Sequence, residues 1–319
     1  MRLLTLTALL SLFGCGSPPE RLPVYLSVPE RGEQLSIGPF EVPQGTEVQI
    51  CRTMKMSNDD QVGVNHVQVA LAQGSHHFIL FRSTKDFRDE VFPCWGTVNF
   101  DDWEFVVDVN KNGGEDWQLD EGQAFIMEPH QQIMIQSHFV NATTVKSPEG
   151  GMATVNLFEV DPNVPHPLHG MFTVDTHIDI QPHSTYTTSR SCTFDQTVYL
   201  AAMTGHFHAR GTEFSVHRFR DNVMMPEEIY DSVHMWDSPE FKIFPQPSDV
   251  FNTFDDGVAF TCDYYNDTDQ HIGWGGHADT QEHCNLFFQY YFYDEHPELR
   301  VPAKPANKPL TCREGSGGW

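Results

Sequence analysis

The chain has 319 residues, of which 39% are hydrophobic and 12% aromatic, a globular composition that excludes a largely disordered protein. This length allows two ordinary domains, each with its own core. The 44 acidic and 19 basic residues give a net charge of −25, so the surface repels phosphate backbones and nucleic acid is excluded as a partner.

The N-terminus has the pattern of a bacterial secretion signal. A basic start is followed by an apolar run too short to span a bilayer, and Cys15 ends the lipobox-like stretch LFGC. We therefore expect residues 1–22 to be a signal peptide, lipobox and tether, with Cys15 lipidated after cleavage.

This signal predicts a location in the bacterial cell envelope, in the periplasm or at the cell surface. The protein would contact the membrane only through its N-terminal lipid. Gly16 follows Cys15 in place of a retention Asp, which favours the outer membrane. Without acylation of Cys15 the protein would be secreted.

Short apolar or alternating runs dominate the rest of the chain, and few stretches show helical periodicity. Gly, Pro and Asn or Asp separate these runs, a pattern that favours β-sandwiches. In the first half we predict strands within 47–51, 67–71, 78–81, 105–109, 133–137 and 153–158. In the second half we predict them within 172–174, 177–180, 198–202, 213–217, 258–262 and 286–292.

A Pro-rich break at residues 161–170 is the best candidate for a domain boundary. It predicts an N-terminal domain over 23–163 and a C-terminal domain over 164–319 that ends in an extended arm.

Two segments have a functional and a plain interpretation. The stretch 108–116 begins like a calcium loop, but Leu119 stands where an EF-hand needs Glu and flanking helices are absent, which favours a polar β-turn. Met54 and Met56 could be soft copper ligands, although Met on a strand is more often part of the core.

Six histidines in strand-like segments are candidate metal ligands: His76, His77 and His138 in the first half, and His206, His208 and His283 in the second. His206 and His208 are two residues apart, so a strand turns both rings to the same face. The adjacent His76 and His77 can share one ion only if their strand bulges, which Gly74 would help. Two sets of three imidazoles suit copper or zinc.

The cysteine count agrees with an oxidising compartment. Of seven cysteines, Cys15 is expected to carry lipid, which leaves an even number for disulfides. The sequence alone leaves their pairing open. Ligation of a metal by thiolates is disfavoured because no Cys-x-x-Cys occurs.

From about Gln49 to Cys312 these segments resemble the type II copper, ascorbate-dependent monooxygenases, the family of peptidylglycine α-hydroxylating monooxygenase and dopamine β-monooxygenase. The matching segments are His76-His77, Gln136-Ser-His138, His206-Phe-His208-Ala-Arg-Gly, and His283-Cys284-Asn285-Leu286 before Tyr290-Tyr291. The resemblance implies an electron-transfer copper on His76, His77 and His138, supported by Gln136. It also implies an oxygen-activating copper on His206, His208 and His283.

The same resemblance implies the architecture and the disulfides. The expected fold is all-β, with two tandem antiparallel jelly-roll-like β-sandwich domains and an active cleft between them. The implied disulfides are Cys51–Cys94, Cys192–Cys312 and Cys262–Cys284, the last of which would hold His283 beside its metal.

Two positions depart from the family pattern. The family has Met where this chain has His283, and three imidazoles form a harder ligand set that also suits Cu(II). Alternatively, His277 takes part and His283 only supports it. The peptide-amidating members also use Arg and Tyr where this chain has Thr204 and Phe287. With Asn285 and Phe287 as substrate contacts, the substrate should be more apolar and less anionic than a glycine-extended peptide.

The implied function is a monooxygenase with two copper ions that hydroxylates an activated C–H bond of a small molecule. It would use O₂ and ascorbate or another one-electron donor. A copper-binding lipoprotein for storage, sensing or delivery is the alternative, and a structural surface protein that holds zinc is a third candidate.

Overall fold

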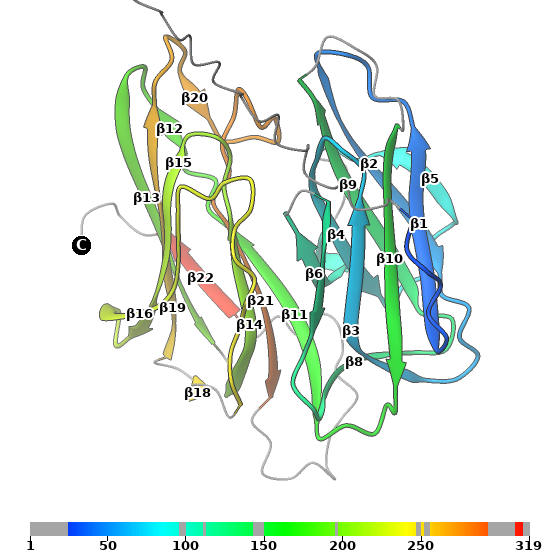
Figure 1. The fold of residues 1–319 in the computed structure, drawn as a ribbon. Coiled ribbons are helices and arrows are strands. Elements are labelled where there is room, and N and C mark those ends of the chain that lie inside the picture. The colour runs from blue at the N-terminus through cyan, green and yellow to red at the C-terminus, as the bar shows by residue number, and fades with distance from the viewer. Residues whose placement is uncertain are drawn as a thin grey trace, which may run out of the picture.

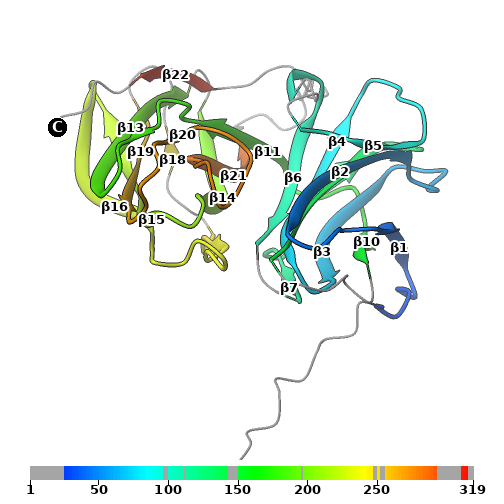
Figure 2. The same cartoon turned by 90° about the horizontal axis from the view of Figure 1, so that it is seen from above.

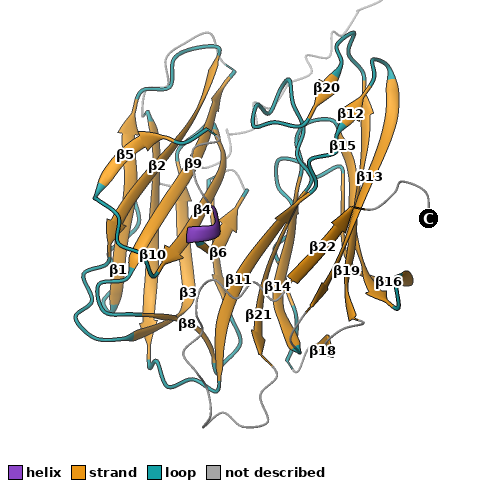
Figure 3. Ribbon diagram, turned by 180° about the vertical axis from the view of Figure 1, so that it is seen from behind, coloured by secondary structure: helices purple, strands orange, loops and turns teal. Residues whose placement is uncertain are grey.

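The computed structural model describes residues 25–95, 100–110, 113–142, 150–194, 197–246, 250–251, 256–292 and 310–314. The expected signal segment, with Cys15, lies outside these residues. In the described part, the elements are strands apart from the 3₁₀ turn Phe100–Asp102, so the all-β prediction is confirmed (Figure 3). No helix of the described residues has the length and hydropathy of a membrane span.

The first half forms two facing sheets. One has the order β5-β2-β9-β4-β6, and the other the order β1-β10-β3-β8 with β7 beside β3. The bounds are β1 Gly32–Phe40, β2 Thr46–Lys55, β3 Val62–Leu71, β4 Ser75–Ser83, β5 Glu90–Pro93, β6 Glu104–Val109, β7 Gly114–Gln118, β8 Gln123–Met127, β9 Gln132–Asn141 and β10 Gly151–Val160. Alternate residues of β4, such as Phe78 and Leu80, fill the core between the sheets.

The second half forms a similar sandwich. One layer has the order β16-β15-β19-β13-β22, and the other, β11-β21-β14-β17, continues the β1-β10-β3-β8 sheet; a small β12-β20 ribbon lies beside them. The bounds are β11 His166–Val174, β12 Asp179–Ile180, β13 Ser184–Phe194, β14 Val198–His206, β15 Gly211–Arg220, β16 Val223–Val233, β17 Lys242–Ile243, β18 Val250–Phe251, β19 Asp256–Asn266, β20 Ile272–Gly273, β21 Asn285–Phe292 and β22 Leu310–Glu314. A second apolar core, which includes Phe214, Phe260 and Phe288, separates these sheets.

The two sandwiches lie side by side and are joined through β11 (Figures 1 and 2). This strand pairs antiparallel with β21 of the second sandwich and parallel with β8 of the first. The face of β4 that points away from the first core places Ile79 and Phe81 in a third apolar cluster with Phe287 of the second sandwich. Residues 161–165 connect β10 to β11, and the domain boundary itself stays a prediction.

A buried ion pair also lies at this boundary. The Arg82 guanidinium donates to both carboxylate oxygens of Glu104, at 2.9 and 2.8 Å, and to the backbone oxygen of Leu168 at 3.1 Å. His169 Nδ1 lies 3.2 Å from the same carboxylate. Burial raises the pKa of Glu104, but Arg82 and His169 outweigh it and bring this pKa to about 2.

The structure contains the three expected disulfides, Cys51–Cys94, Cys192–Cys312 and Cys262–Cys284. Their pairing, which the sequence alone left open, is the one that the family resemblance implied. Met54 and Met56 are buried in the first core, as expected for core residues.

Candidate metal centre

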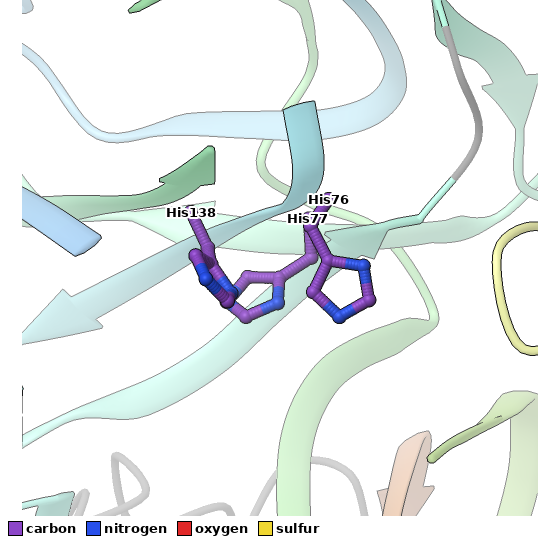
Figure 4. A group of neighbouring side chains, drawn as sticks. All are labelled: His76, His77 and His138. Carbon is purple, nitrogen blue, oxygen red and sulfur yellow. The ribbon is translucent and has the colours of Figure 1, made fainter. Parts of the chain in front are cut away.

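A bulge at the start of β4 turns two consecutive histidines toward one place. The β4–β9 register skips one residue between Ser75 and His77, so His76 is the bulged residue and His77 pairs with His138. Gly74 precedes the bulge with φ of 91°, which favours glycine. The bulge that the adjacent histidines required is therefore present, and Figure 4 shows the three side chains gathered together.

The second set comes from the end of β14 and the start of β21. His206 is the last residue of β14 and pairs with Asn285 of β21. His208 follows in the turn, and its ring lies 4.3 Å from the ring of His283, measured between centroids. The ring of His206 is 5.7 Å from that of His283.

The two sets meet in one cluster. Ring centroids of His76 lie 5.2 Å from those of both His206 and His208, which matches the 5.0 Å between His76 and His138 within the first set. His76 therefore belongs to two groups whose ligand atoms lie within 4.8 Å of one another, one with His77 and His138 and one with His206 and His208. The family resemblance implied one copper site on each set, and in the structure the rings of the two sets lie about as close to each other as the rings within one set.

Eight ring nitrogens of the six histidines are buried and have no hydrogen-bond partner in the protein. They are His76 Nε2, both nitrogens of His77, His138 Nδ1, both nitrogens of His206, His208 Nε2 and His283 Nδ1. Buried polar atoms without partners are rare, and a set of them on imidazoles fits a metal ion as their missing partner. The donor set therefore suits copper or zinc.

The electrostatics of the cluster keep the rings neutral, the form that binds metal. Burial first, and then the neighbouring histidines, hold the pKa of His76, His77, His206 and His283 well below the ordinary value. Burial lowers the pKa of His208 to about 3, although its bond to the backbone of Gln281 acts in the opposite direction.

Side chains behind the ligands fix their orientation. His138 donates from Nε2 to Glu47 at 2.9 Å, which leaves Nδ1 free. His208 donates from Nδ1 to the backbone oxygen of Gln281 at 2.9 Å, which leaves Nε2 free. Such bonds select the tautomer and raise the basicity of the nitrogen that binds the metal.

Glu282 supports the turn that carries His208. Its carboxylate accepts hydrogen bonds from the backbone N–H groups of His208, at 2.8 Å, and Arg210, at 2.7 Å. Burial raises the pKa of Glu282 to about 7 against these bonds. The hydroxyl of Tyr264 donates to the backbone oxygen of His283 at 2.6 Å, which anchors the backbone of His283.

Glu47, Gln281, Glu282 and Tyr264 did not emerge from the sequence. Glu282 could have been found because it adjoins His283. Glu47 carries no local signal, since its partner His138 is 91 residues away and the pairing depends on the β2–β9 register.

The other predicted residues lie around the cluster. Gln136 lies next to the Cys51 sulfur, 4.0 Å from its amide nitrogen, and affects the pKa of His77. Thr204 and Phe287 pair directly across β14 and β21, so the two departures from the peptide-amidating pattern face each other. Phe287 packs on Phe105 with centroids 5.1 Å apart.

Asn285 is partly buried, and its Oδ1 has no hydrogen-bond partner in the protein. His277 lies elsewhere: its Nδ1 contacts Glu47 at 3.0 Å, and its ring is half exposed. Among the described residues, the groups that could hold a metal ion include neither His277 nor His283, although the ring of His283 lies beside those of His206 and His208.

Comparison with solved structures gives weak likenesses. They include the infectious bursal disease virus VP2 subviral particle, with 10% identity over 93% of this chain and 78% of that chain and a TM-score of 0.23. They also include the N-terminal CBM22-1-CBM22-2 tandem domain of Paenibacillus barcinonensis Xyn10C, with 11% identity over 89% and 83% of the two chains and a TM-score of 0.13. Scores this low carry no argument. No curated protein matches the chain.

A family comparison is more informative. Residues 168–311 match the family described as copper type II ascorbate-dependent monooxygenase, C-terminal domain. This range contains His206, His208 and His283. This match assigns the second half of the chain to the C-terminal domain of the copper type II ascorbate-dependent monooxygenases.

Proposed function

We propose that the protein is a copper-dependent monooxygenase that hydroxylates an activated C–H bond of a small molecule. One oxygen atom of O₂ would enter the product and the other would leave as water, with two electrons from ascorbate or another one-electron donor. The observation that carries this proposal is the cluster of buried imidazoles with unpartnered nitrogens, contributed by both halves of a chain with this family's C-terminal domain.

Two copper ions would be held by the two histidine sets, His76, His77 and His138 on one and His206, His208 and His283 on the other. Bound copper supplies one-electron transfer and the activation of O₂. The protein contributes neutral, oriented ligands, because burial keeps the rings deprotonated while Glu47 and the Gln281 backbone fix two of them. The layer between the sandwiches also keeps bulk water from these nitrogens.

The substrate side of the site would be apolar. Thr204 and Phe287 are uncharged where the peptide-amidating members carry Arg and Tyr, and Phe287 packs among Phe105 and Phe172. The Oδ1 of Asn285 has no partner in the protein and is available to accept one hydrogen bond. We therefore propose a largely apolar substrate with a hydrogen-bond donor and no carboxylate anchor.

A second candidate is a copper-binding protein without turnover, for storage, sensing or delivery. It is favoured by His283, since a third imidazole in place of a thioether also stabilises Cu(II). In either case we propose attachment to the bacterial cell envelope through a lipid on Cys15. Mass spectrometry of the mature N-terminus would detect this lipid.

The two candidates differ in product formation. The copper-loaded protein is incubated with ascorbate, isotopically labelled O₂ and a panel of candidate substrates, which are small apolar molecules with one hydrogen-bond donor. His208→Ala is the inactive control. The proposal predicts one labelled oxygen in a product and O₂ uptake that depends on the substrate. Ascorbate oxidation at the same rate with and without every substrate, and no labelled product, would support copper binding alone.

A further inference from the structure

One carboxylate contacts both halves of the molecule beside the histidine cluster. Glu47, on β2 of the first sandwich, accepts from His138 Nε2 through Oε2 at 2.9 Å. Its other oxygen accepts from His277 Nδ1 at 3.0 Å, and the backbone N–H of Ala278 donates to Oε2 at 3.2 Å. These last two residues belong to the loop between β20 and β21 of the second sandwich.

An aromatic side chain closes the same junction. The ring of Trp95 lies 5.0 Å from that of His138 and 4.8 Å from that of His277, measured between centroids. Gly276 allows this contact, because a Cβ there would come within 2.4 Å of the Trp95 ring. The Cys51–Cys94 disulfide anchors the residue before Trp95 to β2.

From His277 the hydrogen bonds continue to the second histidine set. The backbone N–H of His277 donates to Gln281 Oε1 at 3.1 Å, and the backbone N–H of Gln281 donates to the His277 oxygen at 2.9 Å. The backbone oxygen of Gln281 then accepts from His208 Nδ1 at 2.9 Å. A chain of hydrogen bonds thus links one ligand of the first set to one ligand of the second.

We propose that Glu47 is a positioning residue that ties the two histidine sets together through His277 and Gln281. It selects the tautomer of His138 and holds the loop that orients His208. The inference rests on the proposed function in taking these histidines as copper ligands, but the hydrogen bonds themselves do not depend on the metal.

The tautomers can be read without copper. Long-range ¹H–¹⁵N NMR of the full metal-free chain should show His138 protonated at Nε2, and His208 and His277 at Nδ1. Glu47→Gln replaces one of the two acceptor oxygens by an NH₂ donor, so the side chain can accept from only one of the two rings and loses its charge. The signals of His138, His277 and His208 should change together, and the copper affinity of the first set should fall about 10- to 100-fold.

Two further variants separate the chain of bonds from the charge of Glu47. His277→Phe leaves the carboxylate of Glu47 in place and keeps an aromatic ring beside Trp95. It removes only the hydrogen bond from His277 Nδ1 to Glu47, so the NMR signal of His208 should still change. Asp116→Asn is the matched control, because Asp116 also binds a histidine, His66 at 2.6 Å, away from the cluster. It should leave the three signals and copper binding unchanged.

An unchanged His208 signal in both Glu47→Gln and His277→Phe would overturn the inference, as would a His138 protonated at Nδ1 in the wild type. If Glu47→Gln does not fold, His277→Phe alone decides. If the wild type shows these tautomers but neither binds copper nor turns over a substrate, the proposed function is overturned and the inference stands.

Discussion

At the residue scale, His283 would set the chemistry of the proposed second copper site. It lies between Glu282, whose side chain is buried, and Cys284, which is bonded to Cys262. Its backbone is therefore fixed, and a change of side chain should alter the donor atom more than the geometry. This makes it a suitable position at which to test the ligand assignment.

His283→Met should keep two copper ions and place a sulfur in the coordination shell of one of them. A thioether is a soft ligand that prefers Cu(I). X-ray absorption of the Cu(I)-loaded variant would detect the sulfur. His277→Met serves as the control and should show only nitrogen or oxygen ligands. Sulfur in the control and none in His283→Met would assign the third ligand to His277 instead.

Asp108 gives the stability of the protein a dependence on pH. It is buried on β6 and its Oδ1 has no hydrogen-bond partner in the protein; burial raises its pKa to about 7, although Asn110 donates to its Oδ2 at 2.5 Å. The folded chain therefore keeps a proton that the unfolded chain releases above its ordinary pKa of 3.8. The resulting stability is fully present below that pH and is lost as the pH rises through 7.

Asp108→Asn should remove this slope and raise the free energy of unfolding at pH 8 by up to about 4 kcal/mol. Urea denaturation at several pH values between 4 and 8 measures both quantities. The exposed Asp60→Asn is the control and should keep the wild-type slope. An identical slope in Asp108→Asn would show that this carboxyl is ionised in the folded protein.

The sequence predicted the histidines that gather in the cluster but not the residues that orient them. The His-x-His spacing and the His-His pair are local patterns, and strand geometry converts them directly into a shared face. Contacts such as Glu47 with His277 join positions 230 residues apart. They arise from the packing of the two sandwiches, and such packing produces no regular spacing of residues that the sequence would reveal.

At the element scale, the strands predicted from alternating or apolar runs lie inside observed strands, except that residues 177 and 178 precede β12. The sequence did not predict β13, which consists mostly of Ser and Thr, nor β16, and it also missed β1, β5, β7, β8, β17, β18, β20 and β22. β16 even contains Pro226, which is tolerated since this strand forms the edge of its sheet. The Pro-rich stretch 161–170 is not all connection, because β11 begins at His166 despite Pro167, and the domain boundary stays a prediction.

The contact between β6 and β11 depends on the buried ion pair of Arg82 and Glu104. Glu104→Gln would leave the Arg82 charge without a partner and should lower the free energy of unfolding by about 3 kcal/mol. Replacing both residues by Met and Leu should cost much less, since no charge remains buried. Denaturant unfolding of the two variants gives the comparison, and equal losses would contradict this interpretation.

The same pair responds to acid in the opposite sense to Asp108. Because the pKa of Glu104 is held at about 2, its contribution is present above the ordinary pKa near 4.5 and is lost as the pH falls toward 2.

At the scale of the whole molecule, the disulfides constrain loops of very different length. Cys192 and Cys312 are separated by 120 residues, and Cys262 and Cys284 by 22. Loop entropy predicts that replacing the first pair by Ala costs about 5 kcal/mol of unfolding free energy and the second about 3 kcal/mol. Thermal unfolding of C192A/C312A and C262A/C284A measures the difference. A larger loss for the shorter loop would mean that local contacts around His283 dominate.

The packing of the two sandwiches is what turns six scattered histidines into one cluster. The β8–β11 pairing, the apolar contacts of Phe81 and Phe287 and the Arg82–Glu104 pair fix the sandwiches against each other. Both histidine sets thereby reach the same buried layer, and each is expected to hold its own copper.

Copper per chain tests this account most directly. The protein is loaded with Cu, desalted and analysed as wild type, His206→Ala and His217→Ala, the last being a histidine of β15 outside the cluster. We predict two copper ions in the wild type and in His217→Ala, and one in His206→Ala. A single copper in the wild type, or tight zinc in its place, would contradict a two-copper monooxygenase.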